Sequence, residues 1–127
     1  MKPDPGIKRI LCIRPDNMGD ILMSTPAIRA LKEYFGAHIT LLTSRQGSPI
    51  AGFILEIDQT IIADLPWVQL PGPVGDMQSV IEELRSGAFD LAIIFTVFSQ
   101  SALPSALLAF MAGIPRRLAY ARENPYE

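Results

Sequence analysis

Cysteine, histidine and charged residues are all scarce in this chain of 127 residues. The single cysteine, Cys12, excludes an internal disulfide, and its place in an apolar run favours a small buried side chain over a reactive thiol. One histidine, His38, and one cysteine cannot form a cluster of metal ligands, so we expect no metal site. The net charge of −2 offers no overall attraction to phosphates, so we expect no nucleic-acid partner.

Signals for export and for the common nucleotide-binding folds are also missing. The first ten residues, MKPDPGIKRI, lack the apolar core of a signal peptide. The turn after the first apolar run reads R-P-D-N-M-G-D, which contains neither G-x-G-x-x-G nor G-x-x-x-x-G-K-[ST]. Its single glycine does not let a pyrophosphate approach the backbone as closely as a dinucleotide-binding turn does. The sequence therefore argues against a dinucleotide-binding domain and a P-loop nucleotidase.

One segment, residues 91–114, lacks charge altogether and is long enough to cross a bilayer. Ser99, Gln100 and Ser101 interrupt it, and Pro104 follows them. The half before this polar group is rich in β-branched residues, whereas the half after it has a helical composition. We therefore predict a buried strand, a polar turn and a packed helix, and not a transmembrane helix.

Short apolar runs alternate with helical patterns along the whole chain. We predict strands at residues 8–14, 38–43, 59–63, 91–97 and 117–121. We predict helices from residue 21 to Gly36, between residues 48 and 55, from an Asp76 cap to a Gly87 stop, and over residues 104–111. At Pro26, either one helix is kinked or Thr25 caps a second helical piece.

This alternation of strands and helices predicts an α/β fold, a Rossmann-like doubly wound parallel sheet. We expect the strand order 3-2-1-4-5, with helices on both faces. The last predicted strand lies next to residue 127, and a doubly wound domain normally continues beyond such a strand. We therefore expect residues 1–127 to be one Rossmann-like domain that lacks its last part.

Asp20 is the main candidate for chemistry, because it falls where a strand passes through a short turn into a helix. Ligands of open α/β sheets bind outside the carboxyl ends of the strands, and this turn lies at such an end. The first turn of a helix stabilises a carboxylate in its ionised form, ready to accept a proton. Gly19 permits a tight turn and a close approach by a ligand. The alternative is that Asp20 only caps the helix.

Four arginines fall at or near predicted strand ends, and guanidinium groups suit a carboxylate or phosphate ligand. They are Arg14, Arg45, Arg116 and Arg117. Each of them taken singly is also explained as ordinary solvated surface charge.

The segment R-P-D-N-M-G-D-I-L-M-S-T-P-A-I-R-A-L-K resembles the amino-terminal motif of the family 9 glycosyltransferases, the bacterial heptosyltransferases of lipopolysaccharide core synthesis and their relatives. Later pieces follow in a similar order, such as D-L-P-W at residues 64–67, F-D-L-A-I-I at 89–94 and P-R-R-L-A-Y at 115–120. The resemblance covers nearly the whole chain. It implies the amino-terminal, acceptor-side half of a GT-B glycosyltransferase, with the donor-binding domain absent.

The resemblance further implies an inverting transfer of a hexosyl or heptosyl group from an ADP-sugar such as ADP-heptose to a lipopolysaccharide core-type acceptor. Asp20 matches the catalytic base of the family. We expect an acceptor site made by residues of the turn and by two further arginines: Arg14, Asn17, Met18, Gly19, Arg45 and Arg117. No cofactor is implied, since the ADP-sugar is a substrate bound mainly by the other domain, and no metal is required.

The expected partner is a sugar-lipid acceptor, which implies a cytoplasmic protein with peripheral contact to the inner membrane. The chain alone is expected to be inactive. Two other hypotheses remain open. The chain could be a stand-alone, non-catalytic α/β module that binds an anionic sugar or phosphate ligand. It could also be an unrelated flavodoxin-like domain, such as a receiver domain with Asp64 as acceptor acid, although no lysine follows Lys32 in the sequence.

Overall fold

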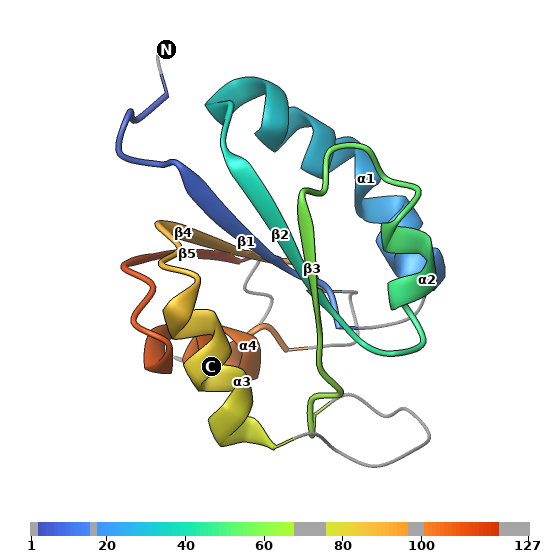
Figure 1. The fold of residues 1–127 in the computed structure, drawn as a ribbon, viewed down its shortest axis with the longest axis vertical. Helices are drawn as coiled ribbons and strands as arrows, with labels where there is room; N and C mark the ends of the chain where they lie inside the picture. Colours follow the sequence, from blue (N-terminus) through green and yellow to red (C-terminus); the bar gives the residue numbers. More distant parts are fainter. Residues whose placement is uncertain (1–2, 16–17, 68–75, 97–100, 120–127) are drawn as a thin grey trace, which may run out of the picture.

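The computed structural model describes residues 3–15, 18–67, 76–96 and 101–119 (Figure 1). Strands and helices alternate through these ranges, as the sequence predicts. The strands are β1 (Arg9–Ile13), β2 (His38–Thr43), β3 (Gln59–Ile62), β4 (Leu91–Ile94) and β5 (Arg116–Ala119). The helices are α1 (Met18–Phe35), α2 (Ser48–Ala51), α3 (Met77–Ser86) and α4 (Leu103–Met111).

The five strands form one sheet in the order β3-β2-β1-β4-β5, and every neighbouring pair is parallel. The predicted strand order is therefore confirmed. At the central strand, Ile13 aligns with Leu42 of β2 and with Ile94 of β4. Because all strands run in one direction, their carboxyl ends share one edge of the sheet, and the turn between β1 and α1 starts from the middle of that edge.

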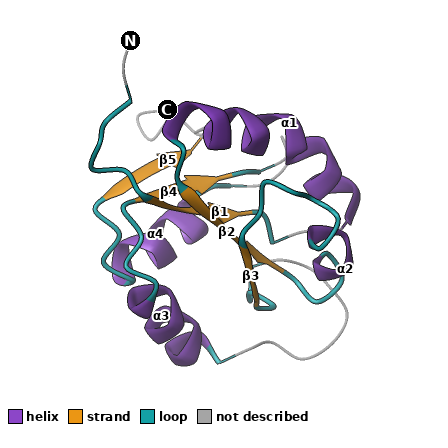
Figure 2. Cartoon of the chain, turned by 45° about the horizontal axis from the view of Figure 1, so that its top comes forward, coloured by secondary structure: helices purple, strands orange, loops and turns teal. Residues whose placement is uncertain are grey.

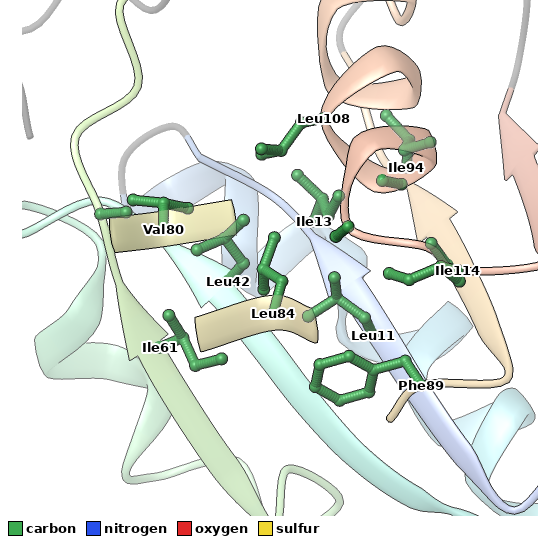
Figure 3. Close-up of a cluster of buried hydrophobic side chains, with 14 of the residues drawn as sticks. Leu11, Ile13, Leu42, Ile61, Val80, Leu84, Phe89, Ile94, Leu108 and Ile114 are labelled. Atoms are coloured by element: carbon green, nitrogen blue, oxygen red, sulfur yellow. The ribbon is translucent and has the colours of Figure 1, made fainter. Parts of the chain in front are cut away.

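Helices cover both faces of the sheet, so the prediction of a doubly wound fold is confirmed (Figures 1 and 2). Successive residues of β1 point to opposite faces: Leu11 belongs to a core cluster with α3 and α4, whereas Cys12 belongs to one with α1 and α2. Figure 3 shows the cluster on the α3 and α4 side, where Leu84 and Leu108 meet the sheet. Burial on both faces explains why β1 is apolar without alternation.

Helix α1 is a single helix with Pro26 inside it, so the structure adopts one continuous helix and not a second piece capped by Thr25. The hydroxyl of Ser24 donates to the carbonyl oxygen of Asp20 at 3.0 Å, and that of Thr25 donates to the carbonyl of Ile21 at 3.4 Å. Gly36 ends the helix with a φ of +60°, as predicted from its position.

Helix α3 begins at the predicted cap, since the Asp76 carboxylate accepts from the backbone N–H of Gln78 at 3.1 Å. It ends at Ser86, and Gly87 follows as the predicted stop, so both predicted ends of this helix are confirmed. Gly87 keeps a φ of −69°, and Ala88 adopts the positive φ of 51°. A Cβ at residue 87 would lie 2.4 Å from the ring of Phe89, so this position requires glycine for close packing and not for its backbone angle.

The remaining predicted bounds are corrected by one to several residues. Strand β4 ends at Ile94, before the predicted end at residue 97, which lies outside the described ranges. The described residues between 91 and 114 include β4 and α4, so the predicted strand and packed helix are confirmed, while Ser99 and Gln100 of the predicted polar turn lie outside the described residues. Within the described part of the chain, no helix is both long enough and apolar enough to span a membrane.

Two carboxylates fix the opposite, amino edge of the sheet. Asp58 precedes β3, and its Oδ2 accepts from the backbone N–H of Ile39 at 2.8 Å and from Nζ of Lys32 at 2.6 Å. Asp90 precedes β4, and its Oδ2 accepts from the N–H groups of Lys8 and Arg9, both at 2.9 Å. Each carboxylate therefore connects the strand that follows it to the start of a neighbouring strand, β3 to β2 and β4 to β1.

Candidate functional site

The candidate site is the carboxyl edge of the sheet, where β1 passes into α1. The backbone N–H of Arg14 donates to the carbonyl oxygen of Leu42 at 3.0 Å, which extends the β1–β2 ladder beyond Ile13. Arg14 is only 5% exposed. In the two-residue period of a strand, it lies on the face of Ile10 and Cys12, which is the face that α1 covers.

Asp20 meets this arginine from the first turn of α1. Nη2 of Arg14 lies 3.3 Å from Oδ1 of Asp20. The two side chains differ in exposure, at 6% for Arg14 and 24% for Asp20. The Asp20 carboxylate therefore forms an ion pair with a buried cation while part of the Asp20 side chain remains open to solvent. The N-terminal end of the α1 dipole adds to the positive potential around this carboxylate.

The other residues predicted to belong to the site in this turn are Met18, Gly19 and Asn17. Met18 and Gly19 form the first residues of α1 and are exposed, Met18 to 46%. Asn17 lies outside the described residues. Two more apolar side chains, Leu22 and Met23, are exposed on the same helix, at 51% and 83%. The surface next to Asp20 is thus partly apolar.

Arg45 follows β2 at the same edge and is bound to Asp64, which follows β3. The Asp64 carboxylate accepts from the Arg45 backbone N–H at 3.0 Å and forms an ion pair with Arg45 Nε. The Arg45 side chain is nevertheless 54% exposed. This anchoring orients the guanidinium without burying it, which suits an anion-binding arginine.

Arg117 does not join these groups through the contacts that the structure describes. Its Nη1 donates to the carbonyl oxygen of Ile114 at 2.6 Å, and its guanidinium carbon lies 5.2 Å from the centre of the Phe110 ring. Both contacts hold the side chain against the C-terminal end of α4 and the entry to β5. The other arginine of this pair, Arg116, forms an ion pair with Asp4 near the N-terminus.

The sequence did not predict that Asp64 binds Arg45. Asp64 was considered only as the acceptor acid of a receiver domain. Its position directly after β3 was the available signal, because residues after parallel strands share the functional edge. Two buried hydroxyl residues at the end of β2, Thr43 and Ser44, were also missed. Ser44 accepts from the backbone N–H of Gly47 at 3.0 Å and so shapes the loop behind Arg45.

The described residues give little support for a metal site or a nucleophilic cysteine. No group of three His, Cys, Asp or Glu side chains is placed to hold a metal ion there. Cys12 is fully buried, and this burial raises the pKa of its thiol to about 12. A thiol in this state is a packing residue and not a nucleophile.

The five-stranded parallel sheet with helices on both faces is the fold of the Rossmann-like half of a GT-B glycosyltransferase. The chain is similar to the solved structure of Escherichia coli ADP-heptose LPS heptosyltransferase II, with a TM-score of 0.68 and 26% identity. That match covers 87% of this chain and 30% of the heptosyltransferase.

A second solved structure, the family 9 glycosyl transferase from Veillonella parvula DSM 2008, matches with a TM-score of 0.64. Its identity is 21% over 94% of this chain and 34% of that protein, so it supports the fold alone. No family model and no curated protein sequence matches the chain. The resemblance to family 9 glycosyltransferases is therefore confirmed through structure, and the chain spans about a third of the two solved proteins, at 30% and 34%.

Proposed function

We propose that this chain is the acceptor-binding domain of an inverting glycosyltransferase, with Asp20 as the general base. The observation that carries the proposal is a partly exposed carboxylate at the first turn of α1, on the ligand-binding edge of the sheet and beside a buried guanidinium. The similarity to glycosyltransferases of the GT-B type supports the same conclusion. A second domain or partner chain would hold the donor.

In the proposed reaction, the Asp20 carboxylate takes the proton of an acceptor hydroxyl. The acceptor oxygen attacks the anomeric carbon of an ADP-sugar from the face opposite the diphosphate. The bond between that carbon and the diphosphate oxygen breaks, ADP leaves with the electron pair, and the anomeric configuration inverts. General-base assistance of this kind contributes about 10²–10⁴-fold to a rate.

The proposed acceptor is an anionic sugar-lipid of the lipopolysaccharide core type, and Arg45 is the group best placed to bind its phosphate or carboxylate. Arg45 is anchored by Asp64 and exposed, whereas Arg117 is engaged with α4. Met18, Gly19 and Asn17 are proposed to form the approach to Asp20. A lipid-linked acceptor would bring the domain to the cytoplasmic face of the inner membrane.

The test is Asp20→Asn in the transferase that carries this chain. Asparagine keeps the shape of the side chain and still caps a helix, but it cannot accept the proton. We expect kcat to fall by about 10²–10⁴-fold while the acceptor Kd stays unchanged. Glu33→Gln, which removes a carboxylate from the exposed side of α1, is the matched control and should leave both constants unchanged.

Two outcomes would overturn the proposal. An unchanged kcat with a lowered melting temperature would reduce Asp20 to a helix cap, worth about 1 kcal/mol. Binding of an anionic sugar without any transfer, in the presence of a donor domain, would favour the stand-alone binding module. Reading the gene beyond the codon for Glu127 would show whether a donor-binding domain follows in the same frame.

A further inference from the structure

We infer that Arg14 is a positioning residue that fixes the Asp20 carboxylate for proton transfer, and not a residue that binds the acceptor. The inference rests on the proposed function of Asp20. The observation behind the inference is that the Arg14 side chain is 6% exposed and that its Nη2 lies 3.3 Å from Oδ1 of Asp20.

The burial of Arg14 separates it from the arginines that face solvent. Arg45 is 54% exposed and can reach a ligand in water, whereas the Arg14 side chain is covered on the α1 face of the sheet. An exposure of 6% leaves almost none of the Arg14 side chain open to a ligand in water. Arg14 therefore acts on an acceptor only through Asp20.

The backbone of Arg14 is hydrogen-bonded to the sheet directly after β1 ends. Its N–H donates to Leu42 in the neighbouring strand, so the guanidinium starts from a fixed point at the middle of the sheet. A guanidinium offers its N–H donors in a planar array. It can therefore hold one carboxylate oxygen in place while the carboxylate stays open to the acceptor.

Kinetics distinguish a positioning residue from a binding residue. Loss of acceptor binding that is common to the ground and transition states raises KM and leaves kcat unchanged. Misplacement of the base by about 1 Å instead lowers kcat by about 10²-fold. We therefore expect Arg14→Met to lower kcat by about 10²-fold with an unchanged acceptor KM. Arg14→Lys, which keeps the charge but not the planar array, should recover part of this loss.

A double-mutant cycle excludes a merely structural effect. If Arg14 works through Asp20, Arg14→Met should have almost no further effect on kcat in an Asp20→Asn background. Partial unfolding would instead reduce kcat by the same factor in both backgrounds. Arg29→Met is the matched control, because Arg29 pairs with Glu56 at 3.6 Å on the exposed side of α1 and lies 60% exposed.

A second measurement avoids any variant that removes the buried arginine. In the 127-residue chain labelled with ¹⁵N-arginine, Asp20→Asn should shift the side-chain Nε–H resonance of Arg14 and leave that of Arg117 unchanged. An unshifted Arg14 resonance would overturn the inference, as would a raised KM with unchanged kcat or an equal loss of kcat in both backgrounds. If Asp20→Asn itself retains full kcat, the proposed function fails together with this inference.

Discussion

Removing the negative charge of Asp58 should weaken the amino edge of the sheet in a way that depends on pH. Burial raises the pKa of this carboxyl, but the hydrogen bond from Lys32, the N–H of Ile39 and the charges of Lys32 and His38 outweigh it and lower the pKa below its ordinary 3.8. The ionised form is therefore the one that stabilises the fold.

The magnitude follows from the contacts. In Asp58→Asn, an amide oxygen at the same place still accepts from Ile39, but Lys32 loses its ionic partner. Both side chains are 33% exposed, so the ion pair is worth only about 0.2–1 kcal/mol, as for surface pairs. The Ile39 bond becomes neutral and loses part of its strength. We expect Asp58→Asn to lower the free energy of unfolding by about 1 kcal/mol at pH 7.

The sign of the pH dependence follows from the lowered pKa. The contribution of Asp58 is fully present above the ordinary pKa of 3.8 that applies in the unfolded chain, and it is lost as the pH falls through the lower pKa of the folded state. Urea unfolding of wild type and Asp58→Asn should therefore differ from about pH 5 to 8, and the difference should shrink as the pH falls through the lowered pKa of Asp58. A difference that does not shrink at acid pH, or that Glu33→Gln reproduces, would refute this reasoning.

Two further predictions concern single positions. Gly36→Ala should lower the free energy of unfolding by about 1 kcal/mol, because residue 36 has a φ of +60°. Gly52 has a φ of −66° and open space around a Cβ, so Gly52→Ala should be neutral or raise the free energy of unfolding by up to about 1 kcal/mol, and thermal melts of both variants would show the contrast. The Cys12 thiol of the native protein should not react with DTNB at pH 8, because it is buried and its pKa is raised to about 12. In urea the same thiol should react fully. Rapid labelling of the native protein would contradict the placement of Cys12 in the core.

The arrangement of strands could be predicted because each apolar run matches one buried strand. Ile10 to Ile13 read as a strand that is covered on both faces, and the structure buries all four residues completely. Asp20 could also be placed, since only local geometry is needed to put it in the first turn of a helix.

The orientation of the arginines could not be predicted, because each partner comes from another strand or helix. Arg14 and Asp20 share one turn, but only the α1 layer explains why the guanidinium is buried. Arg45 meets Asp64 because β2 and β3 are neighbours in a fixed register. Arg117 falls at a strand and was expected at the site, yet the Phe110 ring and the Ile114 carbonyl draw its side chain towards α4.

Pro26 has a mechanical consequence for α1. A proline has no N–H, so the carbonyl of Leu22 lacks its usual helical donor. One backbone hydrogen bond is therefore missing between the first two turns and the rest of the helix. The segment that carries Asp20 is therefore coupled less stiffly to the long arm beyond Pro26, which Ile28 anchors in the core. The Asp20 carboxylate is instead linked to the sheet through Arg14, whose N–H donates to Leu42 of β2.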